Sequence, residues 1–277
     1  MFGYSCVTEK QYQASEIYCI RPRQGAWVTA FAFGDLPGVK RATAFLLTWI
    51  AGFVDAVGFL HYDRVYTANM SGNSVGLGIS DVSNAALAFR HGWPIAFFVA
   101  GLLAGRLFLA VGFRRQMRSV ASLVFALEIG LAALAIESGE WTAVAALALA
   151  MGLQNAAFTR FGSVQVHSGF VTGTLLKATE YAVQYATWLH DRAFGGKRGR
   201  LWLALWLSPR QRSFRLTCEL ILLWVVYVLG ASVGTITERR YSIPALAVPC
   251  ALLLVLIAMD LRRPLSVPEQ REQAAES

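Results

Sequence analysis

The chain has 277 residues, of which 56% are hydrophobic and only 15% are charged, and its mean hydropathy is +0.47. This composition leaves too little polar side chain to cover a soluble globule, which excludes a soluble domain. The net charge of +8 would suit a protein that binds nucleic acid. The basic residues, however, lie in clusters between apolar runs, as they do in cytoplasmic loops, so we expect no nucleic-acid partner.

Apolar runs of membrane-spanning length divide the chain into two tails and one domain. Residues 1–40 form a cytoplasmic N-terminal tail, residues 41–261 the transmembrane domain and residues 262–277 a C-terminal tail. Within the domain, the sequence predicts six spanning helices, at residues 43–60, 94–113, 120–136, 141–158, 220–236 and 243–259. Two further segments, 69–89 and 169–189, are only weakly apolar, and a basic insert follows at 190–217. The predicted fold class is an all-α polytopic transmembrane bundle.

The distribution of charge argues against eight full crossings. Eight crossings would place the basic turn at residues 114–118 outside and the acidic turn at residues 137–140 inside, which violates the positive-inside rule twice. If the two weakly apolar segments instead enter and leave the membrane on one side, both turns fall on the expected sides. We therefore expect six spans plus two half-membrane or broken helices, with both termini in the cytoplasm.

A motif in the first half of the domain returns in weaker form in the second half. The first copy carries Gly52, Asp55, Ala56 and Ser71-Gly72-Asn73, and the second carries Gly152, Asn155, Ala156 and Thr172-Gly173-Thr174. Each copy precedes a Gly-x-x-x-Gly pair in an apolar run, Gly101 with Gly105 and Gly230 with Gly234, which we interpret as packing faces between helices. The copies define repeat one (41–137) and repeat two (141–261). With six spans the repeats are inverted relative to each other, which is typical of secondary transporters.

The segments GFVDAVGF and NMSGNSVGLG in the first repeat, with MGLQNAAF and VTGTLLKA in the second, resemble the YoaK-like family of bacterial membrane proteins. This is a multi-pass family classed as a domain of unknown function. The resemblance covers residues 41–259 and implies a multi-pass protein of the bacterial inner membrane with six spans. It implies no activity, because the family has none assigned.

Asp55 lies inside the first predicted span, where an ionised carboxylate without a partner costs about 2.5 kcal/mol or more. Two interpretations stay open. Asp55 either makes a structural hydrogen bond to a neighbouring helix or to the broken backbone near Ser71, or it exchanges a proton or binds Na⁺ during transport. Because its counterpart in the second repeat is Asn155, the sequence favours one charged and one neutral half-site over the paired acids of hydrolases.

Ser71-Gly72-Asn73 and Thr172-Gly173-Thr174 each place a hydroxyl beside a glycine near a predicted helix start. Such a motif can cap the helix and leave backbone N–H groups free to meet an anion. The alternative is ordinary capping with a glycine that lets two helices approach closely. Three further polar residues would line the same locus: Asn69, Gln154 and Asn155.

Charged residues inside the predicted helices suggest two more features. Lys177 and Glu180 share one helix face, which we expect to point into the bundle. Either this face borders the pathway, or Lys177 only neutralises the charge of Glu180. Arg106 and Glu128 lie at similar distances on either side of a basic turn. An antiparallel hairpin would bring them to similar depth, so we expect an ion pair with either a structural or a gating role.

The sequence as a whole predicts a secondary transporter or channel for a small solute or ion in a lipid bilayer, with a homo-oligomer kept among the candidate partners. A non-transporting scaffold or sensor is the alternative, and we expect it if the centre of the bundle is dry and apolar. An intramembrane enzyme is less favoured, because the sequence has no HExxH, no GxSxG elbow and no phosphate-binding P-loop. We expect no catalytic residue, no cofactor and no bound metal.

Overall fold

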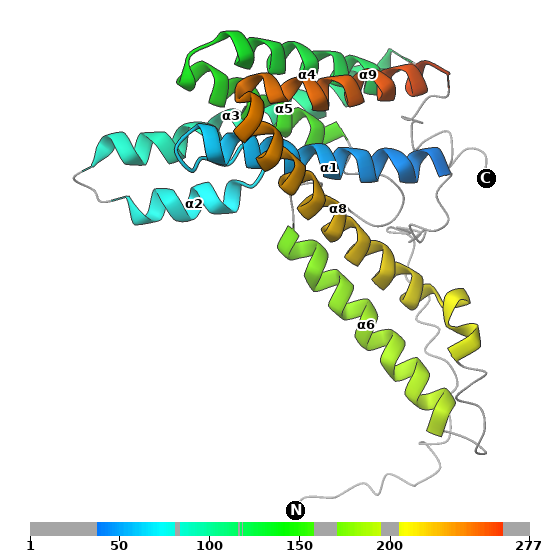
Figure 1. Cartoon of the computed structure of the whole chain (residues 1–277). Helices are drawn as coiled ribbons and strands as arrows, with labels where there is room; N and C mark the ends of the chain where they lie inside the picture. The colour runs from blue at the N-terminus through cyan, green and yellow to red at the C-terminus, as the bar shows by residue number, and fades with distance from the viewer. Residues whose placement is uncertain are drawn as a thin grey trace, which may run out of the picture.

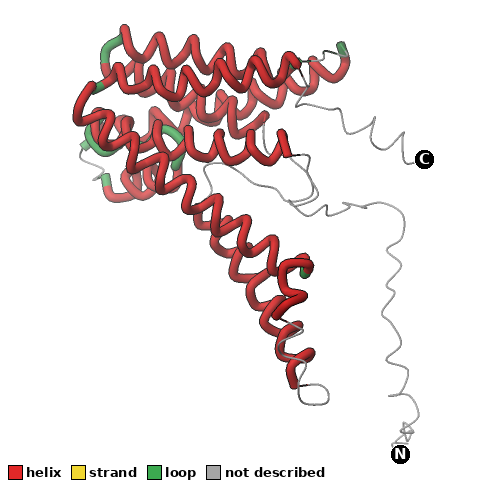
Figure 2. The backbone as a smooth tube through the Cα atoms, turned by 45° about the vertical axis from the view of Figure 1, so that its right-hand side comes forward, coloured by secondary structure: helices red, strands yellow, loops and turns green. Residues whose placement is uncertain are grey.

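A computed structural model describes residues 38–80, 84–115, 117, 119–157, 171–194 and 205–262 of the chain. The secondary structure of these residues is helical, with short loops between the helices (Figures 1 and 2). The main helices are α1 (Gly38–His61), α2 (Met70–Ile79), α3 (Ala85–Arg114), α4 (Val120–Glu137), α5 (Glu140–Ala157), α6 (Val171–Phe194), α8 (Arg212–Tyr241) and α9 (Ala247–Arg262). The predicted all-α polytopic bundle is confirmed. Most of both predicted tails, and residues 195–204 of the predicted insert, lie outside the described residues.

Five of the described helices are long and apolar enough to cross a membrane: Arg41–His61, Ala85–Gly112, Val120–Glu137, Arg212–Tyr241 and Ile243–Arg262. The last of these combines η4 (Ile243–Leu246) with α9. The sequence predicts a sixth span at α5, which has 18 residues and is mostly buried; this crossing stays a prediction. Large apolar side chains are exposed on the spanning helices, as expected for contact with lipid, including Leu103, Leu107, Ile236 and Leu254.

The weakly apolar segment 69–89 does not form one helix. Its first part is α2, whose 10 residues give about 15 Å of helix, half of the roughly 30 Å hydrocarbon core. Its last part begins α3, which starts at Ala85 instead of the predicted residue 94, so that Pro94 lies inside the helix. A proline is tolerated there because neighbouring helices and local adjustments satisfy the freed backbone groups.

α1 and α8 cross where glycines bring their backbones into contact. A Cβ atom on Gly52 of α1 would lie 2.2 Å from the Tyr227 carbonyl oxygen, and one on Gly230 of α8 would lie 2.1 Å from the Trp49 carbonyl oxygen. Gly234, one turn further along α8, makes the same kind of contact. No side chain fits in these spaces, so the prediction that the Gly230/Gly234 pair forms a packing face is confirmed.

α3 and α5 cross in the same way. A Cβ atom on Gly101 of α3 would lie 2.2 Å from the Leu149 carbonyl oxygen, and one on Gly152 of α5 would lie 2.2 Å from the Phe98 carbonyl oxygen. Gly105, one turn along α3, lies against the backbone of Leu153. The Gly101/Gly105 pair is therefore also a packing face, as predicted.

Contacts between helix ends show how the helices are directed. His61 contacts Glu238 at 3.4 Å, so α1 and α8 end close together. Arg90 pairs with Asp63, which lies just beyond the end of α1, and is 3.8 Å from Glu140, so α3 and α5 begin beside the place where α1 ends. We call this side of the bundle the His61 end.

The opposite side of the bundle is the Arg41 end. Arg41 pairs with Glu219 at 3.0 Å, which joins the first turns of α1 to those of α8. Ser122, near the start of α4, donates hydrogen bonds from its amide and hydroxyl to Asp260, near the end of α9. α1, α4 and α8 therefore begin at the Arg41 end, and α3 and α9 finish there.

The two glycine crossings correspond residue by residue. Gly52 lies against the carbonyl of Tyr227, three residues before Gly230, and Gly152 lies against the carbonyl of Phe98, three residues before Gly101. In the reverse direction, Gly230 lies against the carbonyl of Trp49, three residues before Gly52, and Gly101 lies against the carbonyl of Leu149, three residues before Gly152. α1 and α8 are parallel, and α3 and α5 form a second parallel pair of opposite direction. The first helix of each predicted repeat thus packs on the third helix of the other. An inverted repeat requires this arrangement, and the repeat itself stays a prediction.

We expect Gly52→Ala and Gly152→Ala each to lower the free energy of unfolding by about 1–3 kcal/mol, because the added methyl group overpacks a backbone contact. Thermal unfolding of the purified protein in detergent measures the effect. The matched control is Gly130→Ala on α4, where an added Cβ meets nothing within 4 Å. Equal midpoints for Gly52→Ala and Gly130→Ala would contradict the crossing described here.

Candidate functional site

The chain after α1 turns back along the helix that it has just left. The Tyr62 amide donates to the Gly58 carbonyl at 2.9 Å, and Thr67 contacts Gly58 again from the other side of the turn. Asp63 and Arg64 make the reversal with positive φ angles of 47° and 65°, a conformation that non-glycine residues rarely adopt. We call residues 62–69 the return loop. It leads into α2, which lies beside α3 and runs in the same direction as α1 (Figure 1).

Asp55 of α1 holds the return loop through consecutive backbone amides. Its Oδ1 atom accepts hydrogen bonds from the amides of Thr67 at 2.9 Å, Ala68 at 2.6 Å and Asn69 at 3.2 Å. The residue is only 3% exposed. Hydrogen bonds from N–H groups to a carboxylate are roughly twice as strong as bonds between neutral groups, so Asp55 stabilises a backbone segment that has no regular helical partners.

The second oxygen of the Asp55 carboxylate is bound by a residue from the other repeat. The Tyr227 hydroxyl of α8 donates to Asp55 Oδ2 at 2.6 Å. A single carboxylate therefore connects α1, the return loop and α8. Tyr227, which no sequence pattern singles out, lies three residues before Gly230 and so shares the crossing face of α8.

The second crossing lacks this hydrogen bond because both partners differ. Asn155 stands where the first repeat has Asp55, and Phe98 stands where α8 has Tyr227, in each case at the same offset from the crossing glycine. The amide of Asn155 donates instead to the Met151 carbonyl within its own helix at 2.8 Å. The predicted asymmetry between a charged and a neutral position thus extends to the partner residue.

The Ser71-Gly72-Asn73 motif lies in the first turn of α2, and each residue has a different role. Asn73 is fully buried and binds the backbone of Tyr66 twice, accepting from its amide at 3.0 Å and donating to its carbonyl at 2.7 Å. Gly72 lies against the Tyr66 ring, which a Cβ atom would approach to 2.5 Å. The exposed Ser71 hydroxyl donates to Asn69 Oδ1 at 2.6 Å.

This geometry changes the predicted capping scheme. Asn69 is the N-cap of α2, and its side chain makes no capping hydrogen bond. Ser71 lies inside the helix, so the prediction that its hydroxyl caps α2 is wrong. The start of α2 combines the positive end of a helix dipole with an exposed hydroxyl and a partly exposed carboxamide, which suits a small anionic or hydrogen-bonding group.

Gln154 and Asn155 do not join this cluster. Gln154 of α5 is fully buried and donates from Nε2 to the Leu47 carbonyl of α1 at 3.1 Å. Leu47 lies eight residues before Asp55, or about 12 Å along the helix. Among the described residues, neither amide has a hydrogen bond to Asp55 or to the start of α2. In the described structure these two residues therefore do not join the polar cluster through hydrogen bonds: Gln154 connects α5 to α1, and Asn155 bonds within α5.

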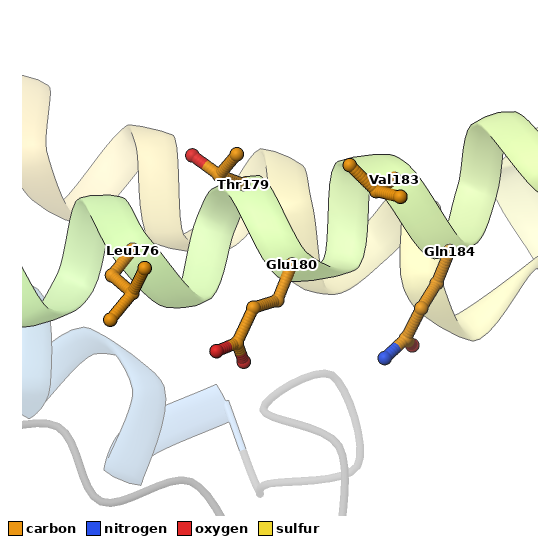
Figure 3. A pocket seen from close by; sticks show the side chains of 5 residues that line it. All are labelled: Leu176, Thr179, Glu180, Val183 and Gln184. Carbon is orange, nitrogen blue, oxygen red and sulfur yellow. The ribbon is translucent and has the colours of Figure 1, made fainter.

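The motif Thr172-Gly173-Thr174, the predicted counterpart of Ser71-Gly72-Asn73, lies at the start of α6, apart from Asp55. α6 packs against α8, burying Ala178 beside Leu220 and Leu223. Lys177 and Glu180 are exposed, so the prediction that they point into the bundle is wrong. Thr172 is also exposed, and Gly173 and Thr174 are partly buried in the first turn of α6. Figure 3 shows Glu180 and Gln184 projecting from one side of α6, where they line a shallow, open depression with Leu176, Thr179 and Val183.

The predicted ion pair between Arg106 and Glu128 does not form. Arg106 is exposed on α3, whereas Glu128 is only 1% exposed on α4. Neither carboxyl oxygen of Glu128 has a hydrogen-bond partner among the described residues. Equal distance from a turn brings two residues to similar depth but does not set their rotation about the helix axes, so this prediction was wrong.

Comparison with known proteins places the chain in a family. The family described as "Protein of unknown function (DUF1275)" matches residues 43–259. The chain belongs to the DUF1275 family. It is 25% identical over 216 residues to the "UPF0700 transmembrane protein YoaK" of Bacillus subtilis (strain 168), an alignment that covers 75% of this chain and 88% of that protein. No solved structure gives a significant match. The predicted YoaK-like resemblance is confirmed, and the DUF1275 chain is an uncharacterised multi-pass transmembrane protein.

Asp55 and Tyr227 give the site a quantitative test. We expect Asp55→Ala to lower the free energy of unfolding by about 3–5 kcal/mol, because it leaves buried donors without an acceptor. Tyr227→Phe should cost about 1.5–3 kcal/mol, the value of one hydrogen bond to a charged group. In the double variant the two costs should not add, because both remove the same bond. Thermal unfolding measures these energies, and hydrogen exchange of the residue 67–69 amides should rise in Asp55→Ala.

Ser71→Ala is the matched control for this cycle, since the exposed Ser71 hydroxyl bonds only to the side chain of Asn69 among the contacts described. It should change neither the unfolding midpoint nor the exchange of the return-loop amides. Additive costs in the double variant would contradict a direct bond between Tyr227 and Asp55.

Proposed function

We propose that this DUF1275 protein is a secondary transporter or channel for a small solute or ion. The observation that carries the proposal is the return loop, an irregular backbone segment held at the Asp55 level of α1 by a buried carboxylate. Irregular backbone inside a membrane protein is tolerated only where it is buried in protein or lines a water-filled cavity. Half-length helices such as α2 begin near binding sites in transporters, where their N-termini face anionic groups.

The arrangement of the helices supports a moving structure. The α1/α8 pair and the α3/α5 pair are each joined by direct backbone contact, which makes each pair a stiff unit. The two pairs run in opposite directions, as in proteins that alternate access by rocking one unit against another around a fixed site. At the His61 end, Arg90 connects them by pairing with Asp63 and Glu140, so opening on this side requires these contacts to separate.

We assign the solute site to the start of α2, where Asn69 and Ser71 are at least partly exposed. The helix dipole favours an anionic group there. Asp55 anchors the wall of this site, and its carboxylate is also our candidate for coupling to a proton or Na⁺, because protonation would weaken the amide bonds that hold the return loop. The neutral Asn155 would leave the second repeat without this coupling.

The distribution of charge supports an orientation in the membrane. Described residues at the Arg41 end include Arg41, Arg114, Arg115 and Arg262, whereas the His61 end carries Asp63, Glu137, Glu140 and Glu238 with a balancing number of arginines. The positive-inside rule then places the Arg41 end in the cytoplasm. Both termini of the transmembrane domain are cytoplasmic in this orientation, and the compartment that we propose is the bacterial inner membrane.

Solute binding at α2 can be tested without knowing the solute in advance. Pools of small carboxylates, phosphates, amino acids and sugars are added to the purified protein, because a ligand that binds the native state raises the unfolding midpoint. Each solute that stabilises the protein is then measured as a radiolabelled substrate in proteoliposomes under a proton or Na⁺ gradient. We expect saturable uptake of at least one solute, reduced about tenfold or more by Ser71→Ala, which corresponds to about 1.4 kcal/mol of lost binding.

The matched control is Ser232→Ala, an exposed hydroxyl on α8 that donates to the Val228 carbonyl of its own helix. It should leave uptake unchanged. If no pool either stabilises the folded protein or enters the proteoliposomes, the result contradicts transport and favours the non-transporting scaffold or sensor.

A further inference from the structure

Glu128 lies on the buried face of α4, in a row of residues that are otherwise apolar. The buried residues of this helix are Val120, Ala121, Val124, Phe125, Glu128, Ala132 and Ala135, which recur at spacings of three and four. These spacings define the one helix face that packs against the bundle. A carboxyl group therefore occupies a position at which the pattern calls for an apolar side chain, near the middle of an 18-residue span.

The other buried acids among the residues that the structure describes have donors. Asp55 accepts from backbone amides and from Tyr227, Asp260 accepts from the amide and hydroxyl of Ser122, and Glu219 pairs with Arg41. Glu128 differs, because neither of its oxygens has a hydrogen-bond partner among the described residues. An ionised carboxylate at such a position would lack compensation for its lost hydration, whereas a neutral carboxylic acid costs far less free energy to bury.

No cation from the packed helices faces Glu128 in the described part of the bundle. α5 has one acidic residue, Glu140 at its first position, and η4 has no titratable residue. On α9 the Cys250 thiol lies within electrostatic reach of Glu128. Asp260 is bound to Ser122, six residues earlier on α4, or about 9 Å along the helix. Arg106 of α3, the predicted partner, is exposed.

We propose that Glu128 is a proton-binding site: its side chain is a neutral carboxylic acid in the closed bundle described here, and it loses the proton when water reaches the contact between α4 and α9. Acidic residues that carry protons in transporters occupy such positions inside the membrane. The protonation state stands on the geometry of α4 alone. Coupling of proton release to solute movement rests on the proposed function, and it would make Glu128 the proton carrier and leave Asp55 as the candidate for coupling to Na⁺.

Infrared spectroscopy of the full chain in lipid bilayers tests the protonation state directly. A neutral carboxylic acid has a carbonyl stretching band separate from those of amides and carboxylates. We expect the wild-type minus Glu128→Gln difference spectrum at pH 7 to contain this band and no carboxylate bands. The measurement needs no substrate and no access of a reagent to the site. A difference spectrum that contains carboxylate bands at pH 7 would overturn the proposal.

Exchange into D₂O tests proton release. We expect the Glu128 band to shift fully, but more slowly than the exposed amides exchange, because water must enter the α4–α9 contact first. A band that never shifts would overturn the release step. Asp260→Asn is the matched control, because Asp260 has donors for an ionised carboxylate; the wild-type minus Asp260→Asn spectrum should contain carboxylate bands instead.

Transport measurements separate this inference from the proposed function. If a solute is transported, Glu128→Gln should abolish the dependence of uptake on a proton gradient while exchange of labelled solute across the membrane continues. Uptake that keeps its full proton dependence in Glu128→Gln would overturn the coupling role, even with a neutral Glu128 in the infrared spectrum. If the protein transports nothing, the infrared result still decides whether Glu128 binds a proton.

Discussion

The arrangement of this protein depends on the bond between one buried carboxylate and three consecutive backbone amides. Asp55 binds the amides of residues 67–69 with one oxygen and the Tyr227 hydroxyl with the other. Without these bonds the return loop would present unpaired amides inside the bundle, where each costs several kcal/mol. With them, the chain can reverse after α1, start a half-length helix and still cross back through α3.

The glycine crossings set the geometry that lets Tyr227 of α8 bond to Asp55 of α1. Direct contact between the backbones of α1 and α8 brings Tyr227, one turn before Gly230, to the face of α1 that carries Asp55. The equivalent crossing of α3 and α5 has the same backbone contacts but holds Phe98 and Asn155 at the corresponding positions. The framework is thus shared by both halves, whereas the charge is confined to one. The described bundle thus has a charged crossing at Asp55 and, apart from it, the buried acid Glu128, which has no hydrogen-bond partner.

The sequence predicted those features that depend on composition and spacing along one helix: the helical class, five of the six apolar spans, the glycine faces and the interrupted segment before α3. It failed where the answer depends on rotation or on distant partners. Spacing shows that Lys177 and Glu180 share a face, but it does not show which face of α6 meets α8. Similar depth likewise did not show whether Arg106 faces Glu128. Tyr227 lies 172 residues from Asp55, and nothing in its apolar run distinguishes it from a lipid-facing aromatic residue.

Side-specific cysteine labelling on either side of α2 tests most directly whether the return loop and α2 re-enter the membrane without crossing it. The native cysteines are replaced, and single cysteines are placed at Arg64, Asn84 and Met117, all of which are exposed. A re-entrant segment predicts that Arg64 and Asn84 react only from the outside and that Met117 reacts only from the cytoplasm. Reaction of Arg64 and Asn84 from opposite sides would show that the segment crosses the membrane, and would contradict the return loop, the inverted pairs and the site at the start of α2.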